Sequence, residues 1–271
     1  MGMTDEQAMD AVVGSDEPIV HTIGPGDLRD ALVKGISDFE AMPTHLIFLC
    51  ILYPFLMLVI ARLFAGYDVL PLVFPLIAGY TIIGPLVATG MYELSRRREE
   101  KLDISRGHAF EIIRLSSIGS IAKLSAILMT IYFIWLGAAW MIYAQTVGDA
   151  VPESLIDFAV QILTTPAGWA LIFIGCGTGF VIATIVFTLS VVSFPMLVHR
   201  DVSVSLAVHT SIRAVAANPI TMGMWAFIVA GALVLGALPF FVGLSVVLPV
   251  LGHATWHLYR KVVEPGGAAF H

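Results

Sequence analysis

The stretch PLIAGYTIIGPLVATGMYELSRRREE, residues 75–100, places a long apolar run directly before a dense cluster of charges. About twenty apolar residues are enough to cross the roughly 30 Å hydrocarbon core of a bilayer as a helix. Arg96, Arg97 and Arg98 follow the run at once, and basic residues beside a span mark its cytoplasmic end. The stretch therefore predicts a transmembrane helix that ends at the cytoplasmic face.

The rest of the chain shows the same apolar character. Of its 271 residues 58% are hydrophobic and only 13% are charged, whereas soluble domains carry about a quarter charged residues. The net charge of −6 and the lack of a basic domain argue against nucleic-acid binding. Six segments are long and apolar enough to span a membrane: Leu46–Ala65, Leu70–Tyr92, Ile118–Tyr143, Gly168–Val198, Ile220–Leu235 and Phe240–Trp256.

The basic residues assign an orientation to these six spans. Of the fourteen lysines and arginines, all except Arg62 fall on one side of the predicted spans. The loop between the third and fourth spans carries Asp149, Glu153 and Asp157 and no base. By the positive-inside rule, both termini are expected in the cytoplasm.

The opening stretch is repeated near the end of the chain, where residues 239–264 read PFFVGLSVVLPVLGHATWHLYRKVVE. Segments that begin at Asp27, Asp103 and Asp201 also resemble one another, because each alternates apolar and polar residues at helical spacing. The chain thus reads as three parallel pseudo-repeats, residues 27–104, 105–201 and 202–264. Identical pairs join the two quoted stretches: Pro75 and Pro239, Gly79 and Gly243, Pro85 and Pro249, Leu94 and Leu258, Arg96 and Arg260, Glu100 and Glu264.

The predicted fold is all-α. We expect a polytopic integral membrane protein with six transmembrane helices in three hairpins, each hairpin preceded by an interfacial amphipathic cytoplasmic helix. Residues 1–20 are acidic and without apolar periodicity, which predicts a disordered N-terminal tail. Residues 21–264 form a single membrane domain, and residues 265–271 a flexible C-terminal tail.

Histidines near the predicted cytoplasmic edge are the first candidate site. His253 and His257 are four residues apart, so they share one face of a helix and can grip a metal ion or a haem. His199 occupies the equivalent place on the fourth span and is a candidate third ligand. The alternative is that these side chains anchor the protein in the headgroup layer and form hydrogen bonds.

Glu93 is the second candidate, since a carboxylate close to hydrocarbon is costly and by default a functional hypothesis. It aligns with His257 between the repeats, so the two side chains can form a polar contact that carries a proton or an ion. Arg96 and Arg97 lie one turn away, and local ion pairs with them are the other explanation.

Three prolines recur at one depth of the predicted spans. Pro85, Pro195 and Pro249 are expected to kink their helices and to shape an inner vestibule. Elsewhere, the spacing of Gly175 and Gly179 is typical of close helix packing. Cys50 and Cys176 lie within apolar spans without metal-ligand spacing, so both are expected to be free and buried.

Several stretches together carry a family resemblance: TIGPGDLRDAL (22–32), LYPFLMLVIARLFAGYDVLPLVFPL (52–76), VSFPMLVHRDV (192–202) and LPVLGHATWHLYRK (248–261). They resemble a bacterial family of predicted integral membrane proteins, domain of unknown function 2189. The resemblance implies an inner-membrane location and brings no catalytic residue. Some members carry the label of cytochrome c oxidase subunit I. A catalytic oxidase subunit holds haems and copper with histidines inside the membrane, whereas every histidine here falls at or beyond the cytoplasmic edge.

The sequence holds no recognisable catalytic constellation, so we do not expect an enzyme. The favoured interpretation is that the protein is an accessory, assembly or scaffolding component of a bacterial inner-membrane complex, for example a respiratory complex. A small transporter or channel with a site between the hairpins is the alternative, and metal or haem handling by the histidines is a further one. No cofactor is predicted beyond that alternative. The expected partners are the lipid bilayer and other membrane subunits or further copies of this chain, and not nucleic acid.

Overall fold

The computed structural model describes residues 18–42, 73–103, 116–148, 154–239 and 241–264. Most of the predicted acidic tail, the predicted first span, the C-terminal tail and most of the predicted amphipathic helix of the second repeat lie outside these ranges. The predictions for those segments therefore remain predictions.

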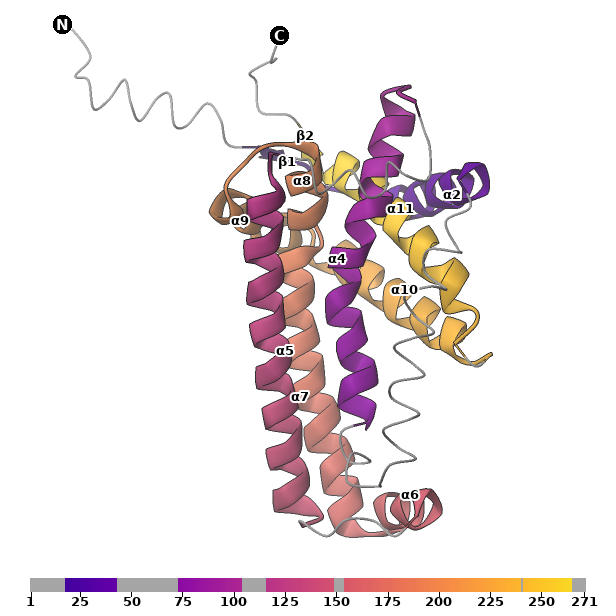
Figure 1. Cartoon of the computed structure of the whole chain (residues 1–271), viewed down its shortest axis with the longest axis vertical. Helices are drawn as coiled ribbons and strands as arrows, with labels where there is room; N and C mark the ends of the chain where they lie inside the picture. The colour runs from indigo at the N-terminus through magenta and orange to yellow at the C-terminus, as the bar shows by residue number, and fades with distance from the viewer. Residues whose placement is uncertain (1–17, 43–72, 104–115, 149–153, 240, 265–271) are drawn as a thin grey trace, which may run out of the picture.

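Three long helices run side by side along the molecule (Figure 1): α4 (Val73–Glu99), α5 (Ile118–Thr146) and α7 (Pro166–Ser190). A short helix, α8 (Ser193–His199), continues α7 after a break at residues 191–192. Pro195 explains the break, because its nitrogen has no hydrogen to donate to the carbonyl of residue 191. The kink predicted at Pro195 stays a prediction, since an interruption of the helix is not by itself a bend.

Within the described ranges, three helical stretches are long and apolar enough to cross a membrane: Ile118–Thr146, Pro166–His199 and Pro219–Ala237. They coincide with the predicted third, fourth and fifth spans. The predicted second and sixth spans are helical over much of their length, in α4 and in α11 (Leu244–Val262), but the structure does not show that these helices cross a membrane. The structure thus supports a helical membrane protein, and the count of six spans in three hairpins is not confirmed.

Helix α10 (Pro219–Ala237) packs against α11, and both lie oblique to α5 and α7 (Figure 1). Helix α11 contacts mainly α2 (Pro25–Ala41) and α4, and its buried side chains extend over most of its length. It carries Pro249 in its interior. Because α11 is covered by two other helices, its side chains pack inside the protein.

Two amphipathic helices, α2 and α9 (Val204–Ala217), match the predicted ones closely. Each ends just before a proline, since proline disfavours helical backbone in the residue ahead of it. Ser203 caps α9 by accepting a hydrogen bond from the backbone N–H of Leu206. Helix α2 begins at Pro25 and not at Asp27, whose carboxylate instead accepts a hydrogen bond from the N–H of Gly24.

The sequence did not predict helix α6 (Leu155–Thr164), which lies at the opposite end of the molecule from α2 (Figure 1). Ser154 caps it by accepting from the N–H of Asp157. Ile156, Val160 and Leu163 are exposed along one side of α6. Such an apolar stripe on a short helix suits the boundary between headgroups and acyl chains.

The two ends of the described chain are tied together. Strand β1 (Ile19–Val20) pairs antiparallel with β2 (Val263–Glu264), so residues 19–20, the last two of the predicted tail, are part of a sheet. The Asn218 side chain accepts from the N–H of Ile23 and donates to the carbonyl of His21. These contacts fix the segment that leads into α2.

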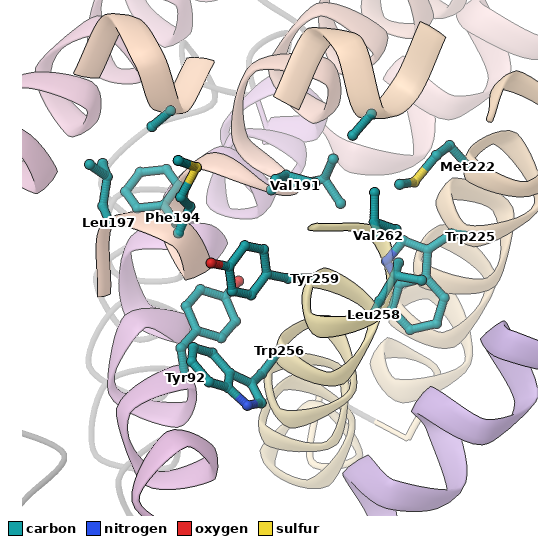
Figure 2. Close-up of a cluster of buried hydrophobic side chains, with 14 of the residues drawn as sticks. Tyr92, Val191, Phe194, Leu197, Met222, Trp225, Trp256, Leu258, Tyr259 and Val262 are labelled. Atoms are coloured by element: carbon teal, nitrogen blue, oxygen red, sulfur yellow. The ribbon is translucent and has the colours of Figure 1, made fainter. Parts of the chain in front are cut away.

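The largest hydrophobic cluster extends along α5 and α7 to the region where α2, α4, α8, α9, α10 and α11 meet. Figure 2 shows Tyr92, Trp256 and Tyr259 grouped beside α8, and Trp225 lying against Leu258 and Val262. The Trp256 and Tyr259 rings are 5.6 Å apart, a separation typical of aromatic pairs. This cluster joins α11 to α4, α8 and α10.

One prediction about the apolar helices is wrong. Cys176 is free, as expected, but it is exposed on α7 and not buried. A thiol is weakly polar, so a helix surface that faces acyl chains accommodates it without burial inside the protein.

Candidate functional site

A buried carboxylate, Asp38, is the centre of a polar network between α2, α4 and α11. Its Oδ2 accepts hydrogen bonds from Ser95 Oγ at 2.6 Å and from His257 Nε2 at 2.8 Å. Its Oδ1 accepts from Arg98 Nη1 at 2.6 Å. The Asp38 side chain is only 6% exposed, and both of its oxygens are satisfied. The network joins Asp38 of α2 to Ser95 and Arg98 of α4 and to His257 of α11. His253 of α11 joins it through Ser95.

His253 extends this network into the interior of the protein. Its Nδ1 lies 2.7 Å from Ser95 Oγ, and the residue is fully buried. Because the only hydroxyl hydrogen of Ser95 points to Asp38, His253 Nδ1 is the donor in this contact. Ser95 is itself fully buried, so its hydroxyl bridges two side chains and is not presented as a nucleophile.

Burial and hydrogen bonding act on Asp38 in opposite directions. Burial raises its pKa, but hydrogen bonds from His257 and Ser95 outweigh burial, and the pKa lies below its ordinary 3.8. The carboxylate is therefore ionised at neutral pH. An ionised acceptor strengthens its hydrogen bonds, and it stabilises the packing of α2 on α4 and α11.

This network predicts a specific loss of stability in acid. Since the folded pKa of Asp38 is lowered, its contribution is complete above the ordinary value of 3.8 and is lost as the pH falls through the folded value. We expect the Tm in detergent to fall more steeply with acid in the wild type than in Asp38→Asn. Thermal unfolding between about pH 7 and about pH 3 measures both slopes. Equal slopes would contradict the prediction.

Glu93, the predicted inner-end residue, is 1% exposed and paired locally. Arg96 donates to it twice, from Nε at 2.9 Å and Nη2 at 2.7 Å, and Arg97 Nε donates at 2.9 Å. The structure thus shows the ion pairs within α4, while His257 contacts Asp38. A carboxylate held by two guanidinium groups is well suited to anchoring the end of a helix.

The three candidate histidines have three different environments. His199 Nδ1 lies 2.9 Å from the Tyr259 hydroxyl, and its ring packs edge-on against Trp256. His253 contacts Ser95, and His257 contacts Asp38. Among the residues that the structure describes, no three His, Cys, Asp or Glu side chains lie together in a way that could hold a metal ion. The predicted metal site thus stays a hypothesis without support from this geometry.

The remaining predicted features are distributed over several helices. Pro195 and Pro249 are buried in α8 and α11, and Pro85 lies within the helical range of α4. Gly179 packs on Trp135, since a Cβ there would lie 3.2 Å from the ring. A Cβ at Gly175 would meet nothing within 4 Å, so close packing within the described chain is confirmed at one of these two glycines.

Sequence reasoning missed Asp38 and Ser95, the two residues that hold the network together. A signal for Asp38 was present, because the buried positions of α2 are Leu28, Ala31, Gly35 and Asp38. They follow helical spacing, so a charged residue continues an otherwise apolar or small stripe. A carboxylate on the buried face of a helix indicates partners on another element.

The long apolar helices together with a polar, charge-paired end define an integral membrane protein. Residues 73–199, from α4 to α8, match the model of the DUF2189 family, which is described as a predicted integral membrane protein. This match confirms the family resemblance over that range. No curated protein and no solved structure matches the chain.

Proposed function

We propose that the protein is an accessory, assembly or scaffolding component of a bacterial inner-membrane complex. In this proposal it crosses the membrane six times as three hairpins, and both termini lie in the cytoplasm. The basic residues at one end of the molecule support the orientation. The acidic and apolar α6 segment at the other end is consistent with it.

One observation carries the proposal: two of the three apolar helical stretches are largely uncovered, whereas 56% of the apolar window of Pro166–His199 is buried. Only 22% of the most apolar window is buried inside the protein in α5, and the same fraction in α10. Large side chains therefore face outward, where lipid or another membrane protein covers them. On α5 and α10 they include Phe133, Ile134, Met141, Ile220, Phe227, Val234 and Leu235.

The described polar groups give less support to a transporter. Hydroxyls within the long helices are bonded to their own backbone: Ser125, Thr130 and Thr184 each donate to a carbonyl one turn earlier. They do not line a polar path. Glu93 pairs within α4 and His199 contacts Tyr259, while His253 and His257 belong to the Asp38 network, so the four candidate side chains do not converge on one site for a solute.

Co-purification tests the proposal directly. The protein is extracted in a mild detergent, separated on a native gel, and the accompanying proteins are identified by mass spectrometry. The same sample is measured for bound metal and for haem absorbance. A stable assembly with other membrane subunits supports the proposal. A protein that migrates alone or only with copies of itself contradicts the accessory role, and stoichiometric metal or haem favours the histidine alternative.

Glycine replacements locate the contact surface. A Cβ at Gly137, Gly177 or Gly231 would meet nothing within 4 Å, so leucine at these positions adds bulk only outward from α5, α7 or α10. We expect one replacement to reduce the recovered partner several-fold while the Tm stays unchanged. Gly179→Leu, which meets Trp135 inside the protein, is the destabilising control. Full recovery with all three outward variants would contradict a partner on these faces.

A further inference from the structure

A groove of about 380 Å³ lies between α2, α4 and α11, beside the Asp38 network. Four basic side chains line it: Lys34 from α2, Arg98 from α4, and Arg260 and Lys261 from α11. Because three helices contribute, this basic groove exists only when they are assembled. Two acidic residues share the lining, so bases outnumber acids among the lining side chains, and Asp27 and Asp30 pair with the two lysines from outside it.

Both acidic residues of the basic groove are already committed to hydrogen bonds. Asp38 accepts from Ser95, His257 and Arg98, as described above. The Glu99 oxygens accept from Trp256 Nε1 at 3.0 Å and from Arg260 Nε at 3.1 Å. These carboxylates therefore hold the arginines in position and leave little capacity to bind a further cation.

Arg260 keeps donors for a ligand, because it uses Nε for Glu99 and within the described ranges its two terminal nitrogens make no hydrogen bond. Arg98 donates from Nη1 to Asp38 and from Nη2 to Ser37, so each of these two nitrogens keeps only its second hydrogen. Lys34 pairs with Asp30, and Lys261 pairs with both Asp30 and Asp27, in partly exposed ion pairs that a stronger anion can replace. A guanidinium fork with ammonium groups beside it matches the oxygens of a phosphate group.

The place of the basic groove relative to the predicted bilayer indicates which phosphate fits. The last turns of α4 and α11 carry the basic residues at the level predicted for the cytoplasmic headgroups. An amphiphile placed here would set its phosphate among the bases, at the level of the surrounding headgroups.

We propose that the basic groove binds the phosphate group of an anionic ligand, and that this ligand is an anionic phospholipid of the cytoplasmic leaflet. Arg260 and Arg98 hold the phosphate, and Lys34 and Lys261 add attraction. The site is independent of the accessory role, since it requires no protein partner. It would fix α2 to the membrane surface and to the two helices beneath it.

Native mass spectrometry with defined lipids tests the proposal. The full-length protein in detergent is titrated with phosphatidylglycerol or phosphatidylcholine, and bound lipid is counted. We expect tighter binding of phosphatidylglycerol, and a loss of about fivefold or more in Lys34→Gln/Arg260→Gln, because each charge near an anionic surface contributes about fivefold. The matched control Arg29→Gln/Lys101→Gln removes the same charge from exposed positions outside the groove and should bind as the wild type does.

Further measurements distinguish a phospholipid from free phosphate as the ligand. Inorganic phosphate that raises the Tm as much as phosphatidylglycerol does would keep the phosphate site but overturn the lipid as its ligand. Equal binding of phosphatidylcholine, or equal losses in the groove variant and its control, would overturn the site itself. Arg260→Lys keeps the charge and should retain most of the affinity, which distinguishes loss of charge from loss of folding.

Discussion

Glu93→Ala is expected to lower the stability of the folded protein by about 3 kcal/mol, measured as a lower Tm in detergent. The substitution leaves Arg96 and Arg97 without the carboxylate that accepts three of their hydrogen bonds. Removing one partner of a buried ion pair costs roughly 3–5 kcal/mol. The lower end applies here, because the two arginine side chains keep 19% and 18% of their surface exposed and water can reach them.

Two variants separate this buried pair from ordinary surface charge. Glu100 also pairs with Arg96, at 2.7 Å, but its side chain is 41% exposed. Glu100→Ala should therefore cost less than about 1 kcal/mol. Glu93→Gln keeps an acceptor oxygen and should fall between the two. If Glu93→Ala and Glu100→Ala had the same Tm, the buried ion pair would not stabilise the end of α4 as its geometry indicates.

Because of this expected loss of stability, the phenotype of Glu93→Ala cannot distinguish between the candidate functions. An alanine there reduces the amount of folded protein whether the protein transports a solute or supports a complex. His257→Gln is a better functional probe, since glutamine can still donate to Asp38 through its amide. A phenotype in His257→Gln at normal abundance would favour a role for the imidazole itself.

Local patterns explain why much of the helical layout could be predicted. Helices α2 and α9 end before prolines, and Ser203 caps α9, so these boundaries depend on neighbouring residues in the sequence. The apolar runs of α5, α7 and α10 are likewise continuous in the sequence. The ion pairs of Glu93 are equally local, because helix geometry brings residues three and four apart together. Such features need no knowledge of the tertiary fold.

The network at Asp38 could not be predicted in the same way. Its partners Ser95 and His257 lie 57 and 219 residues away in the sequence, so no local spacing joins them. The sequence paired His257 with Glu93 through the repeat. The structure pairs it with Asp38, because α2 packs on α11 and brings Asp38 within reach of the end of α4. Helix α6 was also missed. It begins at a cap formed by Ser154, and its apolar residues were not distinguished from those of the neighbouring predicted spans.

Gly35→Leu is expected to separate α2 from α11 and to have an effect at least as large as that of Glu93→Ala. A Cβ at Gly35 would lie 2.7 Å from the Cβ and the backbone nitrogen of Ala254, so the two helices touch almost backbone to backbone. Relieving that clash requires the helices to move apart, because the backbone of Ala254 cannot rotate away as a side chain can. Overpacking of this kind costs about 1–3 kcal/mol, and the loss of the Asp38 hydrogen bonds adds to it.

Alanine at the same place makes the test sharper, because two effects oppose each other. Alanine favours a helix over glycine by about 1 kcal/mol, so propensity alone predicts that Gly35→Ala stabilises the protein. The 2.7 Å approach predicts the opposite sign. Gly26→Ala, on the same helix with nothing within 4 Å of its Cβ, is the matched control and should not destabilise. A lower Tm for Gly35→Ala alone, together with faster proteolysis of α2, would show that glycine at this crossing sets the distance at which Asp38 reaches Ser95 and His257. A raised Tm in both variants would mean that α2 does not pack on α11 as closely as this, and the basic groove between them would lose its third wall.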